Sequence, residues 1–105
     1  MEICVDEYKE LEYVESHSKK VEYLEPFAQK SFYKKARVFT MQNGSEVMVS
    51  YQTPIVLWDI NSDNMIRLQA NDRYTTSATT MNHVRAFMYR HGKQTVSKGE
   101  WKVHT

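Results

Sequence analysis

The spacing of apolar residues changes along the chain and separates helical from extended segments. From Asp6 to about Leu24, apolar side chains recur every three or four positions, which predicts an amphipathic helix. These side chains are Tyr8, Leu11, Val14, Val21 and Leu24. Ser16-His17-Ser18 is the point at which this helix would divide in two. Pro26 disfavours helical geometry at the residue before it and is expected to end the unit.

Beyond Phe32 the pattern becomes the alternation of a half-buried strand, with Phe32, Ala36 and Val38 on one side. Asn43-Gly44 then predicts a tight hairpin turn, because this dipeptide accepts positive φ angles. A return strand follows, with Val47, Val49 and Tyr51 on one side.

After Thr53-Pro54, the run Ile55-Val56-Leu57-Trp58 is apolar on both faces. Such a strand needs a cover on each side, either two helices or one helix and a partner chain. Residues 61–64 are expected to form a turn, and residues 65–69 the third strand.

A helical pattern follows five hydroxyl residues that lie between Thr75 and Thr80. Met81, Val84, Phe87 and Met88 form its apolar stripe, and Gly92 is placed to end it with a left-handed cap. The hydroxyl residues cap the start of this helix or present it to a partner, and the sequence leaves both interpretations open.

Together these segments predict an α+β fold: an acidic N-terminal helix, a three-stranded antiparallel meander, one helix packed on the sheet, and a short C-terminal helical turn. Ser97 and Glu100 have the spacing of a capping box, so this last turn is expected to carry Trp101 back to the core. Residues 1–30 are expected to be an acidic helical extension, and residues 31–105 the α+β core domain.

Composition adds that the protein is small and lacks the marks of export. Of its 105 residues, 41% are hydrophobic, and no apolar stretch approaches the roughly 20 residues of a membrane span. The acidic start does not resemble a secretion signal, and the single Cys4 cannot form an intrachain disulfide. We therefore expect a cytoplasmic protein.

The charges are segregated along the chain. Residues 1–30 carry eight acids and four lysines, whereas residues 31–105 carry ten bases and five acids. The acidic part either folds onto the basic part or onto a neighbouring copy, or the two surfaces stay free for partners. The candidate partner-binding acidic face consists of Glu7, Glu10, Glu12, Glu15, Glu22 and Glu25.

Catalytic and metal-binding motifs are not found. Asp59, Asn61 and Asp63 have the spacing of a calcium loop, but Asn64 stands where glycine is needed and Ala70 where glutamate is needed. These residues are expected to form a polar turn. No two histidines have the i,i+4 spacing of a metal pair on one helix. We expect a protein that is not an enzyme and that uses no cofactor or metal.

Four stretches of residues 31–105 carry a family resemblance: KSFYKKARV, VSYQTPIVLWDI, YTTSATTMNHVRAF and SKGEW. They resemble a family of small uncharacterised proteins from phages and mobile elements of Gram-positive bacteria, with Gly99 where that family usually has lysine. The family brings no established activity and no catalytic residue. The resemblance implies a phage setting, in which small proteins without catalytic groups often act stoichiometrically on a host machine.

Two functions are therefore expected as alternatives. The first is an inhibitor of host defence of the anti-CRISPR type, which binds a protein or ribonucleoprotein such as an RNA-guided nuclease, as a monomer or a homodimer. The second is a small nucleic-acid-binding accessory or regulatory protein. Its binding face would consist of Arg73, Asn82, Arg85, Tyr89, Arg90 and Lys93.

Overall fold

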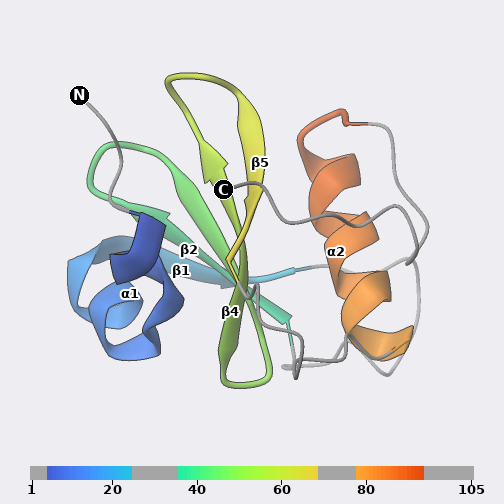
Figure 1. Ribbon diagram of the computed structural model, residues 1–105, viewed down its shortest axis with the longest axis horizontal. Helices are drawn as coiled ribbons and strands as arrows, with labels where there is room; N and C mark the ends of the chain where they lie inside the picture. Colours follow the sequence, from blue (N-terminus) through green and yellow to red (C-terminus); the bar gives the residue numbers. More distant parts are fainter. Residues whose placement is uncertain (1–4, 25–35, 69–77, 94–105) are drawn as a thin grey trace.

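Five antiparallel strands form the middle layer of the molecule, with short helices on one face and a longer helix on the other (Figure 1). The computed structural model describes residues 5–24, 36–68 and 78–93. The elements are η1 (Val5–Lys9), α1 (Leu11–His17), β1 (Ser18–Tyr23), β2 (Ala36–Met41), β3 (Glu46–Ser50), β4 (Thr53–Asp59), β5 (Asn64–Arg67) and α2 (Ala78–Arg90). The strand order is β1-β2-β3-β4-β5, so each strand pairs with its neighbours in the sequence.

The prediction of one long N-terminal helix is wrong, because the helix ends at His17 and the chain continues as β1. At the helix end, side chains satisfy the last carbonyl groups: Ser16 donates to Tyr13 O at 3.2 Å and Ser18 donates to Glu15 O at 3.2 Å. Ser18 is already extended, with φ −85° and ψ 150°. The apolar spacing of Val21 and Leu24 fitted a helix by coincidence, since these two side chains belong to an edge strand and its exit.

The hairpin at Asn43-Gly44 is confirmed. Gly44 N donates to Met41 O at 3.0 Å, and Gly44 has φ +95°. Asn43 does not need a positive φ, and its side chain accepts a hydrogen bond from Ser45 N at 2.9 Å instead. The loop therefore has three residues, a turn followed by one left-handed glycine.

The second error concerns residues 47–58. The sequence predicted one return strand that continues into the apolar run after Pro54, whereas the structure has two paired strands, β3 and β4. They are joined at Tyr51, which has φ +59°, a conformation unusual for a bulky residue. Neither Tyr51 nor Gln52 is a typical turn residue, so the turn carries no sequence signal. The sheet thus has five strands, and the predicted three-stranded fold class is wrong.

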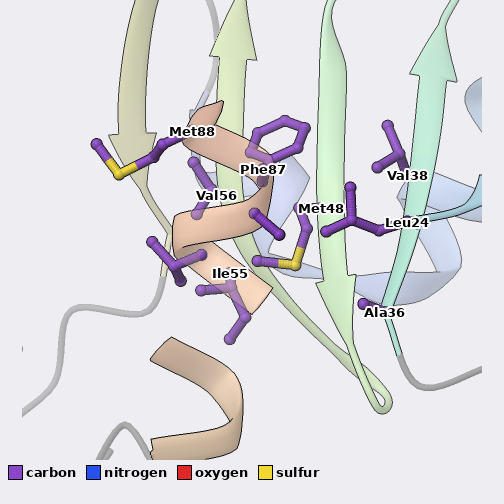
Figure 2. Packing of buried hydrophobic residues seen from close by; sticks show 10 residues of the cluster. Leu24, Ala36, Val38, Met48, Ile55, Val56, Phe87 and Met88 are labelled. Atoms are coloured by element: carbon purple, nitrogen blue, oxygen red, sulfur yellow. The ribbon is translucent and has the colours of Figure 1, made fainter. Parts of the chain in front are cut away.

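Both faces of the sheet are apolar and covered, as the run from Ile55 to Trp58 indicated. On one face, α2 packs its apolar stripe over the sheet (Figure 2). This cluster contains Leu24, Ala36, Val38, Met48, Ile55, Val56, Val84, Ala86, Phe87 and Met88. On the other face, Val14 of α1 packs with Phe39, Met41, Val47, Val49, Leu57 and Leu68. Two helical covers explain why nearly every residue of β3 is buried.

The end of α2 follows the sequence prediction closely. Gly92 has φ +68°, Gly92 N donates to Tyr89 O at 3.0 Å, and Lys93 N donates to Met88 O at 2.9 Å. These are the two hydrogen bonds of a Schellman cap. Of the helices in the described ranges, none is long and apolar enough to cross a membrane.

Several predictions concern residues outside the described ranges. These are the start of the first strand at Phe32, the end of the third strand at Gln69, the hydroxyl residues from Thr75 to Ser77, and the C-terminal turn with Trp101. Within the described residues the molecule is a small α+β domain. The expected boundary at residue 30 stays a prediction.

Candidate functional site

The most distinctive surface of the described chain is acidic and lies on η1 and α1. Its four carboxylates, Glu7, Glu10, Glu12 and Glu15, are all exposed. We call these four residues the acidic surface. Glu12 and Glu15 lie three positions apart on α1 and therefore share one side of it.

Packing of the opposite side of α1 orients the acidic surface outward. Val14 is fully buried against the sheet, and the half-buried Leu11 and Tyr8 pack beside it. Tyr8 and Tyr13 meet edge to face, with ring centroids 5.5 Å apart, so η1 and α1 hold each other as one cover. The glutamates are thus carried on a backbone fixed by the core.

No ion pair between described residues uses the acidic surface. The acids that form such pairs are Glu22, Glu46 and Asp63. Glu10 is the N-cap residue of α1, yet its side chain makes no capping hydrogen bond. The four carboxylates are therefore exposed charges with no cation from the described chain against them.

Two of the six predicted acidic residues are not part of this surface. Glu22 lies on β1 opposite Val38, whose side chain belongs to the cluster under α2, so Glu22 faces the other side of the sheet. There Arg90 Nη2 donates to Glu22 Oε1 at 2.5 Å. Glu25 lies outside the described residues.

A second charged cluster lies where the end of α2 meets β1 and β3. Arg90 donates to both oxygens of Glu46, from Nε at 3.0 Å and from Nη2 at 3.2 Å. His91 Nε2 lies 2.8 Å from the same Glu46 Oε1. The Glu46 carboxylate on β3 therefore binds Arg90, the last residue of α2, and His91, the residue after it. Arg90 also reaches Glu22 on β1.

Aromatic packing and a second ion pair extend this cluster to β4 and its turn. The His91 ring stacks on Trp58 at 4.2 Å and meets Phe87 edge to face at 5.0 Å. Trp58 Nε1 donates to Asp63 Oδ1 at 2.7 Å, and Lys93 Nζ donates to Asp63 Oδ2 at 2.7 Å. The end of α2 thus contacts β3 through Glu46, β4 through Trp58, and the β4–β5 turn through Asp63.

The pKa values in this cluster follow its contacts. Burial alone would raise the pKa of Glu46, but the hydrogen bonds and charges of Arg90 and His91 outweigh burial and lower it. Hydrogen bonds from Lys93 and then Trp58 lower the pKa of Asp63. The hydrogen bond to Glu46 raises the pKa of Arg90. These shifts keep Glu46, Asp63 and Arg90 in their charged forms at neutral pH.

The predicted nucleic-acid face is largely engaged within the protein. Arg90 and Lys93 are in the ion pairs just described. Arg85 is half-buried and Tyr89 is 66% exposed on α2, and each makes a further contact within the chain. Asn82 lies on α2, but its side chain is outside the described set. Arg73 is outside the described residues altogether.

The turn at residues 59–63 is the polar turn that the sequence predicted. Asp59 Oδ1 accepts a hydrogen bond from Asn61 N at 3.1 Å, and Asp59 Oδ2 accepts one from Ser62 Oγ at 2.7 Å. Asp63 has φ +57° and directs its carboxylate to Trp58 and Lys93. Among the described residues no group of three or more histidine, cysteine or acidic side chains is placed to hold a metal ion.

Sequence reasoning missed a buried polar pair. Ser50 Oγ and His83 Nδ1 lie 2.8 Å apart, and both residues are buried, at 2% and 0% exposure. A substrate cannot reach this serine, so the pair is a structural link between β3 and α2. Ser50 lies in the stretch VSYQTPIVLWDI and His83 in the stretch YTTSATTMNHVRAF, two of the stretches that carry the family resemblance. This shared membership was the one sequence signal for the pair.

Glu46 was missed as well, although a signal exists in the sequence. It is the only acidic residue between positions 26 and 58, and it opens the apolar strand Glu46–Ser50. A lone carboxylate beside a buried strand requires a partner.

Comparison with known proteins gives one match. A model of a family of unknown function (DUF8033) matches residues 23–103, which is most of the chain. No curated protein and no solved structure matches. The matched segment contains β2 to β5 and α2, whereas η1 and α1, which carry the acidic surface, precede it.

Proposed function

Because the chain belongs to the family of unknown function DUF8033, we propose its role from its charged surfaces: the protein binds a basic partner through the acidic surface, stoichiometrically and without catalysis. The partner is a protein or ribonucleoprotein. In its specific form, the proposal is an inhibitor of host defence that occupies the nucleic-acid groove of an RNA-guided nuclease.

One observation carries this proposal. Four glutamates within residues 7–15 are exposed and unused by the ion pairs of the described chain, on η1 and α1, whose apolar side chains pack against the sheet. Exposed like charges on one side of a fold create a field that attracts and orients a partner of opposite charge. A charge set that served only solubility would not need this fixed backbone.

The choice of a nuclease groove follows from charge and from the family resemblance. Channels that hold a guide RNA and its target are strongly basic, because they neutralise phosphates. A short acidic helix on a small domain fits such a channel in sign and size. The phage resemblance of residues 31–105 supports the same target class.

The nucleic-acid alternative receives less support. Binding to phosphates requires basic side chains that face solvent without internal partners. Arg90 is held by Glu46 and Glu22, and Lys93 is held by Asp63. To bind a phosphate, these two residues would first have to leave their carboxylates.

The test compares two variants with the same change in net charge. Glu10→Gln/Glu12→Gln/Glu15→Gln removes three charges from the acidic surface, and glutamine keeps nearly the same helix propensity as glutamate. Gln42→Lys/Gln52→Lys/Asn61→Lys adds three positive charges at exposed positions in the sheet turns. Both variants shift the net charge by +3, so a general charge effect acts on them equally.

Purified protein is titrated into cleavage reactions of guide-loaded nucleases from Gram-positive hosts. We expect inhibition that is complete near a one-to-one ratio, is lost or weakened by about tenfold or more in the glutamine variant, and is kept in the lysine control. Full inhibition by the glutamine variant would refute a role for the acidic surface. If no nuclease is inhibited and immobilised protein captures no defence protein from host lysate, the specific inhibitor role fails.

A parallel binding assay addresses the alternative. Mixed-sequence DNA and RNA are tested at about 50 mM and about 200 mM salt, where phosphate binding falls steeply. We expect no binding at either salt concentration. Salt-dependent binding that disappears in Arg85→Glu would transfer the function to α2.

A further inference from the structure

Strand β1 forms one edge of the sheet, and no described strand pairs with its outer side. Leu24 N donates to Ala36 O at 2.9 Å, just beyond the strand end. In an antiparallel pair, the residues whose backbone groups face the neighbouring strand alternate with those that face away. The N–H and C=O groups of Tyr23 and Val21 therefore point to the outer edge.

The side chains of this edge strand are unusually exposed for apolar residues. Val21 is 54% exposed and Tyr23 is 52% exposed. They lie opposite Phe39 and Arg37 of β2, so they are on the α1 face, beyond the area that α1 covers. Edge strands normally carry charged or polar residues at such positions to prevent association.

The order of charges along β1 is complementary to itself when the strand is reversed. Lys20 and Glu22 flank Val21 and both point to the α2 face of the sheet. In an antiparallel pair of two such strands centred on Val21, each Lys20 lies directly opposite the Glu22 of the other strand.

We propose that a second copy of this chain pairs with β1 across a two-fold axis at Val21. The outward backbone groups of Val21 and Tyr23 bond those of the second copy, and the two sheets become one continuous sheet. The two Val21 side chains cover each other on the α1 face. Because the axis is perpendicular to the sheet, both acidic surfaces lie on the same face of the dimer.

A second copy fits this edge better than a foreign peptide for two reasons. The strand itself supplies the complementary charges, with no assumption about another sequence. Lysines at an edge usually repel a like strand, but here the register places each Lys20 against a carboxylate. A different register, shifted by two residues, would place Val21 opposite Lys19 or Tyr23 and lose the Lys20 to Glu22 pairs.

The first experiment measures the oligomeric state of the full chain by sedimentation equilibrium, with Val21→Lys as the disrupting variant. This change places two lysines at the axis, whereas in the monomer the residue is largely exposed and the fold tolerates it. Ile60→Lys is the matched control, since Ile60 is 43% exposed in the β4–β5 turn, away from β1. We expect a wild-type dimer, a control dimer, and a Kd raised at least about tenfold in Val21→Lys.

The second experiment tests the register by exchanging charges. Lys20→Glu alone and Glu22→Lys alone each place like charges opposite one another, so both homodimers weaken. Mixing the two variants restores opposite charges at both positions, and we expect a heterodimer with near wild-type affinity. Circular dichroism confirms that each variant is folded, which matters for Glu22→Lys because Glu22 also binds Arg90.

Amide exchange adds a readout that does not depend on mutation. We expect exchange at Val21 and Tyr23 to slow as protein concentration rises, while the Leu24 amide, bonded to Ala36, is unchanged. A wild-type chain that stays monomeric at about 1 mM would overturn the proposal. So would a dimer unaffected by Val21→Lys, or a monomer that uses β1 to take up an extended peptide of another protein.

Discussion

His91 stacks on Trp58 with ring centroids 4.2 Å apart and an interplanar angle of 19°, and the same imidazole reaches Glu46 through Nε2 at 2.8 Å. Trp58 and Glu46 are themselves partners in the β3–β4 register. The histidine that caps α2 therefore binds two adjacent strands at one point. The position of α2 on the sheet depends on its last turn as much as on its apolar stripe.

Replacing Glu46 by glutamine should loosen this attachment. Glutamine keeps the shape but removes the charge that Arg90 and His91 share, and the Glu46 side chain is only 13% exposed. We expect the free energy of unfolding to fall by about 1–3 kcal/mol, measured by urea denaturation. Asp63→Asn is the control: it removes an exposed ion pair with Lys93 and should change stability much less. Equal losses in the two variants would contradict a special role for Glu46.

The same carboxylate gives stability a defined pH dependence. Its pKa in the folded protein is below the ordinary value of 4.5, so its contribution is fully present above that value and is lost as pH falls through the folded pKa. We expect the stability difference between wild type and Glu46→Gln to shrink as pH falls below about 4, where Glu46 becomes protonated in the folded protein. Urea titrations of both proteins at each pH measure this difference. A difference that grows as pH falls below about 4 would reverse the sign and refute the explanation.

The buried pair of Ser50 and His83 should contribute to stability and not to binding. Ser50→Ala leaves a buried imidazole nitrogen without its hydroxyl, and we expect a loss of about 1–3 kcal/mol. Ser62→Ala is the matched control, since its hydroxyl makes a hydrogen bond of 2.7 Å to Asp59 at an exposed turn. Thermal unfolding of Ser50→Ala and of Ser62→Ala measures the stability loss of each variant relative to the wild type. Partner binding by Ser50→Ala at a temperature where it is folded should equal that of the wild type.

Gly44 has both a positive φ angle and a close neighbour, Ile60, and alanine substitutions can distinguish the effects of the two. It has φ +95°, and a Cβ there would lie 2.8 Å from Ile60 Cδ1. Gly92 has φ +68° with nothing within 4 Å of its would-be Cβ. We expect Gly92→Ala to cost about 1–2 kcal/mol from backbone strain alone, and Gly44→Ala to exceed it only slightly, because Ile60 Cδ1 is the far end of an exposed side chain that can rotate away. Adding Ile60→Ala to Gly44→Ala should recover part of the excess, as measured by urea denaturation.

The parts of the fold that could be predicted from the sequence are those with local signals. The Asn43-Gly44 hairpin and the Gly92 cap were correct because glycine marks left-handed backbone directly. The need for covers on both faces was correct because the run from Ile55 to Trp58 in β4 is apolar at successive positions and therefore on both faces. The apolar stripe of α2 was correct at Val84, Phe87 and Met88, which have the spacing of one helix face, whereas the Met81 side chain lies outside the described set.

The errors have physical causes too. The turn at Tyr51 uses a residue that normally avoids positive φ, so no composition signal marks it. Strand β1 was assigned to a helix because it is an edge strand whose apolar residues are exposed, and its spacing continued that of α1. The links between Ser50 and His83 and between Glu46 and Arg90 join residues 33 and 44 positions apart, which no local pattern reveals.

For the acidic surface, sequence reasoning named the residues but not their arrangement. Glu7, Glu10, Glu12 and Glu15 lie together on one cover of the sheet, whereas Glu22 binds Arg90 on the opposite face. Counting charges along the chain could not separate these two environments. The separation depends on where the helix ends, at His17.

The shortness of α1 has a consequence for recognition. A helix of seven residues is far below the roughly 12 residues at which isolated helices become marginally stable, so it exists through the contacts of Val14 and its neighbours with the sheet. A free peptide of this segment would display the same glutamates without their spacing. A partner that reads the spacing therefore distinguishes the native protein from its nascent, unfolded or proteolysed forms.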